Sequence, residues 1–368
     1  MNTTYLDYNA TAPTHPGVIE AVAACLRETG NPSSVHASGR RARSLMEAAR
    51  ETVARAVNCL PRQIVWTSGG TEANALVLKG VPARSFFVSS VEHDSVLANA
   101  PEAMRLPVDA SGVVDLEALS AAMAQAEGPR LVSVMLANNE TGVLQPIAEI
   151  AECCRAGGAW LHVDAVQALG KVPVDVQALG ADFLTLSAHK VGGMKGVGAL
   201  VLANDLIEIK SPVRGGGQEL GRRAGTENLP GVVAFGAALQ ELETLEGWTS
   251  RVAALRNRME DALQAAGAEV NARDAQRLPT TSSVRMPGVP AETQVMAFDL
   301  AGIAVSAGSA CSSGKVKASH VLSAMGLGEE AASQSVRVSL GWNTTDADVD
   351  RFIAAWQRLY ERRRVAER

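Results

Sequence analysis

Short apolar runs alternate with longer segments whose apolar residues recur at helical spacing along the first half of the chain. In order, the strand-like runs and the helical segments between them are 63–68, 71–79, 85–89, 94–100, 131–137, 147–157, 160–164 and 182–186. This alternation predicts a parallel sheet with helices on both faces. Such sheets bind ligands at the carboxyl ends of their strands, so the residues that follow each run are the first to consider for a site.

The pattern changes near residue 228, where long helical segments begin and continue to residue 266. Strand-like runs follow at 282–286 and 335–340. The chain has 368 residues, more than a single hydrophobic core usually organises. We therefore predict an α/β fold with a large domain at 14–250 and a smaller α+β domain at 251–368, joined by the N-terminal segment 1–13.

The composition is typical of a soluble, mildly acidic globular protein, with 20% charged residues, 47% hydrophobic residues and a net charge of -5. No basic excess points to nucleic acid or an anionic membrane as a direct partner. No apolar run approaches the ~18 residues of a membrane span, and the first residues do not resemble a signal peptide. The five cysteines lack the spacing of a disulfide framework, so we expect reduced thiols and a cytoplasmic location.

Lys190 follows one of the strand-like runs and shortly precedes Gly192 and Gly193. Burying an unpaired ammonium is costly, and the same desolvation lowers the pKa of a lysine and yields the neutral amine that carbonyl chemistry needs. Schiff-base formation with pyridoxal 5'-phosphate (PLP) is the leading use of such a lysine. The alternative is a surface lysine at the point where a strand leaves into a Gly-rich turn.

Two other strand ends carry groups that suit the same cofactor. Gly70 and Thr71 follow the first strand and open a helix, whose N-terminus favours a phosphate. A plain turn with Thr71 as the helix N-cap is the alternative. Asp164 ends another strand, where a carboxylate can pair with the pyridine nitrogen of PLP and keep it protonated. An ordinary capping aspartate is the alternative there.

Three further residues have chemistry that depends on their surroundings. His93 follows a strand and can stack on a cofactor ring and move protons near neutral pH, although a lone histidine is more often structural. Cys311 lies in a loop of small residues, which predicts an accessible and reactive thiol. Arg337 alternates with apolar residues on a strand; facing a cleft it would bind a substrate carboxylate, whereas facing solvent it would mean little.

Several motifs occur in a fixed order almost from end to end. They are YLDYNATAP (5–13), NPSSVH (31–36), TSGGTEAN (67–74), NNETG (138–142), HVDAVQ (162–167), SAHK (187–190), RGGGQE (214–219) and RAGTEN (223–228). Together they closely resemble the cysteine desulfurases, the NifS/IscS-like branch of the class V aminotransferase family. Motifs in series are far more specific than any one of them. The sequence departs from the usual family pattern at 314–317 and at Ala188, where many members have glycine.

The resemblance implies a fold type I PLP-dependent transferase that works as a homodimer, with active sites at the subunit interface. It implies that Lys190 forms the Schiff base, that Asp164 pairs with the pyridine nitrogen, and that His93 stacks on the ring. Gln167 would bond the phenolic oxygen. The residues that the resemblance assigns to the phosphate are Gly70, Thr71, Ser187, His189 and the partner's Thr226.

The resemblance also implies a substrate and a reaction. Asn139 and Arg337 would receive the carboxylate of L-cysteine, Lys190 would move its Cα proton, and His93 would carry a proton. Sulfur would remain on Cys311 as a persulfide while L-alanine leaves. The acceptor would be a sulfur-acceptor or iron–sulfur scaffold protein, which also makes the persulfide of Cys311 a prospective ligand of an iron–sulfur cluster.

Other activities on the same scaffold stay open at this point. A selenocysteine lyase would use the same groups, and a plain aminotransferase or β-lyase would not need Cys311. A non-catalytic partner subunit that keeps the fold is a further alternative, and the intact set of Lys190, Asp164, Cys311 and Arg337 argues against it. The physiological sulfur acceptor does not follow from the sequence.

Overall fold

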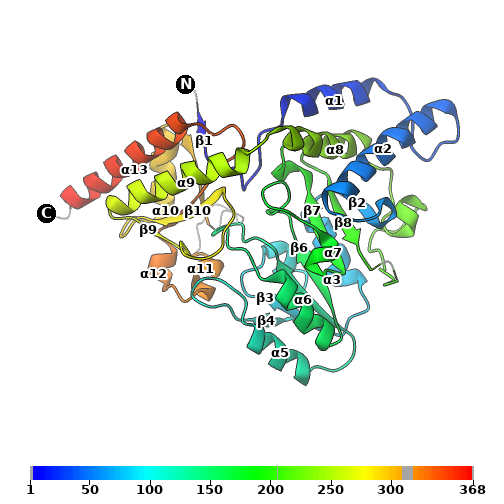
Figure 1. The fold of residues 1–368 in the computed structure, drawn as a ribbon, viewed down its shortest axis with the longest axis horizontal. Helices are drawn as coiled ribbons and strands as arrows, with labels where there is room; N and C mark the ends of the chain where they lie inside the picture. Colours follow the sequence, from blue (N-terminus) through cyan, green and yellow to red (C-terminus); the bar gives the residue numbers. More distant parts are fainter. Residues whose placement is uncertain (1–2, 205, 309–317, 367–368) are drawn as a thin grey trace.

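The computed structural model describes residues 3–204, 206–308 and 318–366, and a seven-stranded sheet dominates it (Figure 1). In spatial order the strands are β2 (Ile64–Thr67), β8 (Gly198–Leu202), β7 (Phe183–Ser187), β6 (Ala159–Asp164), β5 (Arg130–Met135), β3 (Ser85–Ser89) and β4 (Met104–Leu106). β8 is antiparallel to both of its neighbours, and the remaining pairs are parallel. Every strand of this large sheet except β8 therefore runs in one direction, and their carboxyl ends share one edge.

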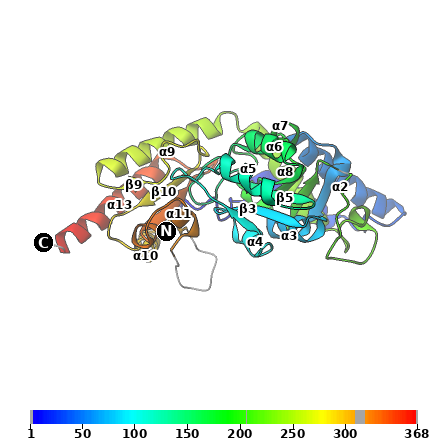
Figure 2. The same ribbon diagram turned by 90° about the horizontal axis from the view of Figure 1, so that it is seen from below.

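Helices cover both faces of the large sheet (Figure 2). One face carries α3 (Gly70–Gly80) and α4 (Asp94–Leu97). The other carries α1 (Pro16–Arg27), α2 (Ala37–Ala56), α5 (Leu116–Gln125), α6 (Ile147–Ala156), α7 (Val176–Leu179) and α8 (Leu229–Thr244). Successive strand residues face opposite ways, so along β8 Ala199 packs into one core and Leu200 into the other. Burial on both faces explains why the strands read as continuous apolar runs.

A smaller antiparallel sheet lies beside the large one (Figures 1 and 2). Its spatial order is β12 (Ser306–Ala307), β13 (Ser335–Ser339), β10 (Thr281–Arg285) and β9 (Glu269–Val270). The helices α9 (Trp248–Ala265), α10 (Ala291–Leu300) and α13 (Asp346–Ala366) pack on this small sheet, and α9 lies beside α13 (Figure 1). The remaining elements are α11 (His320–Ala324), α12 (Glu329–Ala332) and the short helices η1 (Pro61–Gln63), η2 (Ala188–Lys190) and η3 (Gln218–Gly221).

The N-terminal segment, residues 3–15, connects the two sheets. Its strand β1 (Thr4–Tyr5) pairs with β11 (Ile303–Ala304), and the fully buried Leu6 packs into the core of the small sheet. A few residues later the Ala12 amide donates to the carbonyl of His189, 2.9 Å away, beside the large sheet. The segment therefore fixes the position of the small sheet relative to the large sheet.

The structure confirms the α/β fold with a mainly parallel sheet, and it corrects details of the sequence prediction. The helix predicted at 94–100 ends at Leu97. The helical region at 228–266 is two helices, interrupted by a turn in which Gly247 has a φ of 65°. Thr71 is not a helix N-cap, because Gly69 holds that position. The domain limits 14–250 and 251–368 stay a prediction, and Leu278 packs into the core of the large sheet.

None of the helices in the described part of the chain combines the length and the apolar character that crossing a lipid bilayer requires.

Replacing Leu6 with alanine tests the role of the N-terminal segment in stability. Leu6 is 0% exposed, so we expect Leu6→Ala to lower the free energy of unfolding by about 2–5 kcal/mol through lost burial and a residual cavity. The control, Leu300→Ala, changes a side chain that is 88% exposed and should alter stability by only about 0.5 kcal/mol. Urea unfolding followed by tryptophan fluorescence measures both. Equal effects of the two variants would contradict the bridging role.

Candidate active site

A cavity of 230 Å³ lies at the carboxyl edge of the large sheet. The sequence-predicted residues that line it are Gly70, Thr71, His93, Asn139, Asp164, Gln167, Ser187, His189 and Lys190. They come from the ends of β2, β3, β5, β6 and β7 because parallel strands place their carboxyl ends together. The fold thus brings into one cavity residues that are up to 120 positions apart (from 70 to 190).

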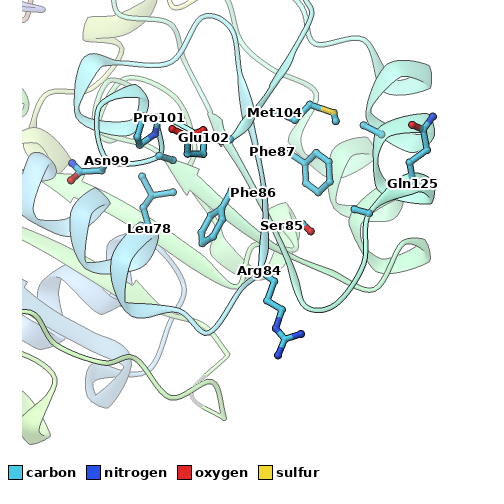
Figure 3. Close-up of a pocket in the computed structure, with 14 residues that line it drawn as sticks. Leu78, Arg84, Ser85, Phe86, Phe87, Asn99, Pro101, Glu102, Met104 and Gln125 are labelled. Carbon is cyan, nitrogen blue, oxygen red and sulfur yellow. The ribbon is translucent and has the colours of Figure 1, made fainter.

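A second cavity, of 540 Å³, lies at the opposite end of β3 (Figure 3). Arg84 and Ser85, at the start of the strand, line it, and Phe86 and Phe87 point to opposite sides of the strand. Neither Lys190 nor any other sequence-predicted site residue in the described part of the chain lines it. Volume alone therefore does not identify the site, and the convergence of polar groups does.

Asp164 ends β6 with its carboxylate held in place by two donors. It is 6% exposed; its Oδ2 accepts from Asn74 Nδ2 at 2.8 Å, and its Oδ1 accepts from the Val166 amide at 3.0 Å. Asn74 lies on α3 and also donates to Ser95 Oγ at 2.9 Å. A carboxylate that is buried and held by hydrogen bonds in this way is positioned to pair with a cationic group in the cavity.

His93 is linked to the same hydrogen-bond system. It is the N-cap of α4; its Nδ1 accepts from the Ser95 amide at 3.1 Å and lies 2.8 Å from Ser95 Oγ. A continuous path of contacts therefore runs from His93 through Ser95 and Asn74 to Asp164. This path fixes the orientation of the imidazole ring at the cavity wall.

The wall beside α3 suits a phosphate. Ser187 is 2% exposed, and its Oγ has no hydrogen-bond partner in the part of the chain that the structure describes. A Cβ atom on Gly70 would come within 2.9 Å of Val166 Cγ2, so glycine keeps the start of α3 open. An unpartnered buried hydroxyl beside the N-terminus of an 11-residue helix is a site for an anionic group. These residues fit the phosphate of PLP.

His189 and Lys190 follow β7 on the short helix η2. Lys190 Nζ donates to the carbonyl oxygens of Asn9 and Ala10, at 2.5 and 2.8 Å. Burial, with the nearby charges of Lys190 and Lys195, lowers the pKa of His189 to about 4. His189 is therefore neutral at pH 7, and it can offer an anion an N–H donor but not a charge.

Arg337 lies on β13 beside the cavity and is fixed by two contacts. Its NH2 donates to Asp7 Oδ1 at 2.8 Å and its NH1 to the Asn139 carbonyl at 3.1 Å. Its Nε is buried and makes no hydrogen bond within the described ranges. Because a guanidinium has five N–H donors in a rigid plane, the remaining ones can receive a carboxylate.

Two predicted residues that the structure describes, Arg337 and Thr226, are not among those that line the cavity. Arg337 contacts the cavity residue Asn139. Thr226 is exposed on the segment between β8 and α8, and its assignment to the partner's cofactor stays a prediction. Cys311, with its proposed persulfide and cluster contacts, lies outside the described residues. Within residues 3–204, 206–308 and 318–366, no group of three or more His, Cys, Asp or Glu side chains could hold a metal ion.

Comparison with known proteins agrees with this geometry. The family model "Aminotransferase class-V" matches residues 4–352. The chain belongs to the class V aminotransferase family. "Cysteine desulfurase IscS 1" of Archaeoglobus fulgidus is 41% identical to it over 98% of this chain and 97% of that protein, and "Cysteine desulfurase" of Cereibacter sphaeroides is 41% identical over 96% and 94%.

Solved structures of this family superpose on nearly the whole chain. The NifS-like protein of Rickettsia africae has a TM-score of 0.91 and 36% identity, covering 98% of this chain and 100% of that one. "SspA in complex with cysteine" has a TM-score of 0.79 and 30% identity, covering 92% and 99%. These findings confirm the predicted family, the PLP-dependent fold type I and the cofactor. This class V family member is a PLP-dependent enzyme.

The structure adds residues around the cavity that the sequence prediction missed: Asp7, Asn9, Asn74 and Lys171. Asn9 is 1% exposed and contacts residues of both sheets. Lys171 is 8% exposed, and the signal for it was a lysine among the apolar residues of Ala168–Val174. Asp7, Asn9 and Asn74 fall inside motifs used for the resemblance, but their contacts cross long sequence distances.

The burial of His162, on β6, predicts how the stability of the protein depends on pH. It is fully buried between Ser133 Oγ at 2.8 Å and Thr185 Oγ1 at 3.0 Å, and burial lowers its pKa to about 4. Below its unfolded pKa of about 6.5, the unfolded chain binds a proton that the folded protein does not. Stability should therefore fall as the pH drops from 6.5 to 4, by about 2 kcal/mol at pH 5 from this group alone.

An NMR titration of the histidine ring protons measures the pKa, with His162→Gln to assign the signal. A signal that titrates near pH 6.5 in the folded protein would contradict the burial argument. The variant should also lose this part of the pH dependence of unfolding.

Proposed function

We propose that this enzyme is a cysteine desulfurase that converts L-cysteine to L-alanine and holds the sulfur as a persulfide on Cys311. The observation that carries the proposal is the convergence of Lys190, Asp164 and the unpartnered Ser187 on one cavity, in a chain about 40% identical to proteins named cysteine desulfurase. The solved structure of SspA in complex with cysteine, which is 30% identical to this chain, supports the choice of substrate.

Different residues of the cavity would bind different parts of the cofactor. Ser187, Thr71 and the start of α3 would hold the phosphate, with His189 as a neutral donor and Thr226 supplied by the partner subunit. Asp164 would keep a proton on the pyridine nitrogen, Gln167 would donate to the phenolic oxygen, and His93 would lie against the ring. When bound, PLP supplies the electron sink for chemistry at the Cα of an amino acid.

Arg337 and Asn139 would position the substrate carboxylate. Asp7 and the Asn139 carbonyl already fix the guanidinium plane, so binding would not need to order a flexible side chain. Asp7 Oδ2 in turn accepts from Ser306 Oγ at 2.8 Å, so the carboxylate that pairs with Arg337 is itself held in place. Asn139, which contacts Arg337 through its carbonyl, lines the same cavity as Lys190.

Proton and sulfur transfer would use two residues of this chain. Lys190 Nζ, as the neutral amine, takes up the Cα proton of the substrate. The thiolate of Cys311 attacks the substrate sulfur; an S–S bond forms, the C–S bond breaks, and its electron pair goes to the carbon, which is then protonated. L-cysteine and one thiol thus become L-alanine and one persulfide, with atoms and electrons in balance.

The same family fold leaves two other activities to distinguish. A selenocysteine lyase would use the same carboxylate and amine contacts, and a β-lyase or aminotransferase would work without Cys311. We infer in addition that the enzyme is a homodimer that delivers sulfur to an acceptor or iron–sulfur scaffold protein. A cytoplasmic location is part of the proposal and fits the free thiols of Cys25, Cys59, Cys153 and Cys154.

Cys311→Ala separates substrate binding from sulfur removal. The groups that bind PLP and the amine and carboxylate of L-cysteine remain, so mixing should still shift the visible spectrum. Sulfur removal should fail, because an alanine methyl is not a nucleophile. The control Cys153→Ala, a half-buried thiol on α6, should keep activity.

In the wild type, mass spectrometry after L-cysteine should find one added sulfur atom on the Cys311 peptide. Alanine production by Cys311→Ala at the wild-type rate would favour the lyase alternative.

Asp164→Asn tests the carboxylate at the end of β6. A neutral amide cannot stabilise a protonated pyridine, so turnover should fall on the order of 100-fold while the cofactor stays bound. Asp299→Asn, at an exposed position on α10, is the matched control and should leave turnover unchanged. Steady-state assays with L-cysteine and the visible spectrum of each purified variant measure the two effects. Near-normal turnover in Asp164→Asn would show that another group holds the ring nitrogen.

A further inference from the structure

Lys171 is a buried lysine close to the active site that the proposed reaction does not use. It lies in the connection between β6 and α7 and is 8% exposed. Its Nζ donates to Asn9 Oδ1 at 3.0 Å and to Gln167 Oε1 at 2.9 Å. Both acceptors belong to side-chain amides that are themselves buried, at 1% and 6% exposure. Such a lysine needs an explanation, because desolvating an amine is costly.

The contacts of the amine show that it donates to both neighbours, since each partner of its Nζ is an amide carbonyl oxygen, which can only accept. Burial, followed by the charges of Lys190 and Arg337, lowers the pKa of Lys171 well below its usual value. Neither of these two acceptors is a carboxylate, so Lys171 does not form an ion pair through these contacts.

A lysine amine determines which way a neighbouring amide points. An amide side chain has an oxygen that accepts and a nitrogen that donates, and it can rotate to exchange them. Because Lys171 donates, Gln167 must turn its Oε1 toward Lys171 and its Nε2 the other way. Gln167 Nε2 accordingly donates to the Asn9 carbonyl at 2.9 Å, and the side chain lines the cavity.

The same logic applies to Asn9. With Oδ1 turned to Lys171, its Nδ2 donates to the Asn139 carbonyl at 3.1 Å and to Thr281 Oγ1 at 3.0 Å. One amine thus contacts the carbonyl oxygens of two side-chain amides, one just after β6 and one in the N-terminal segment. Without it, each amide would be held only through its nitrogen, and its oxygen would lose its donor.

We propose that Lys171 is a positioning residue whose Nζ fixes the Gln167 amide so that an N–H, and not the carbonyl oxygen, faces the phenolic oxygen of the bound cofactor. The inference rests on the proposed role of Gln167 and goes beyond it. An N–H donor stabilises negative charge on that oxygen, whereas a flipped amide would place its carbonyl oxygen against it. Lys171 therefore influences the cofactor without touching it.

The test is the pH titration of the visible absorption band of the purified holoenzyme. Lys171→Met keeps the length and apolar stem of the side chain and removes its donors. Losing a hydrogen bond to a charged oxygen should raise the titration midpoint by about one pH unit. Lys79→Met, at an exposed position on α3, removes a lysine elsewhere and should leave the midpoint unchanged.

A double-mutant cycle shows whether Lys171 acts through Gln167. Gln167→Met should raise the midpoint in the same direction, and the Lys171→Met/Gln167→Met double variant should shift it no further than Gln167→Met alone. A purely structural role of Lys171 would lower the melting temperature without this non-additive spectral shift. Circular dichroism melts of all variants provide that comparison.

Each outcome bears on the proposal. A shift in Gln167→Met with an unchanged midpoint in Lys171→Met, or additive shifts in the double variant, would overturn the positioning role and leave the proposed function intact. No shift in Gln167→Met would overturn both the assignment of Gln167 and this inference. If Lys171→Met does not fold, Lys171→Leu, which also has no donor, replaces it. An unchanged midpoint in Lys171→Leu would likewise overturn the proposal.

Discussion

The geometry of the active site depends on Asn9, a buried residue of the N-terminal segment. Its carbonyl oxygen accepts hydrogen bonds from Lys190 and Gln167, and its side chain bonds Lys171, Asn139 and Thr281. Its backbone N–H donates to Ser339 Oγ, on the small sheet, at 3.0 Å. Residues from both sheets therefore meet on one asparagine. An unpaired buried polar group costs free energy. This network therefore specifies a single arrangement of the large and small sheets around the cavity.

Burial decides which groups in and behind the cavity carry charge. Glu92 is fully buried, its Oε1 accepts from the Met135 amide at 2.7 Å, and its pKa is raised well above the usual value by burial and by the charge of Asp164. His162 is buried in its neutral form, as its lowered pKa shows. Asp164 lies among these groups and is held by two N–H donors. Burial thus acts on the protonation of Glu92 and His162, while hydrogen bonds orient the carboxyl group that faces the cavity.

The segment that carries Thr226 is tied to the rest of the chain by ion pairs. Glu219, with a positive φ of 48°, pairs with the buried Arg50 at 2.8 Å and accepts from the Trp66 amide at 2.9 Å. Arg223 pairs with Glu72, whose Oε2 also accepts from the Ser68 amide just before α3. These ion pairs hold the segment against its own chain, and none of its residues lines the cavity in the described part of the chain. Such an exposed and anchored segment is consistent with the proposed homodimer.

The sequence by itself determined the fold class, the family and most of the cavity lining, for a local reason. Strands can be recognised because their residues alternate between apolar and polar or are apolar throughout. The polar residues that follow the strands of a parallel sheet share one edge, so Asp164, Ser187 and Lys190 could be grouped from their positions alone. The C-terminal end of α4 was placed three residues too late, at 100 and not at Leu97, and the turn between α8 and α9 was not located, because helix ends depend on capping and packing. Only the tertiary structure decided the roles of Asn9, Asp7 and Lys171. Their partners are between 4 and 330 residues away, and no local pattern specifies which amide a buried amine will meet or which carboxylate will fix Arg337.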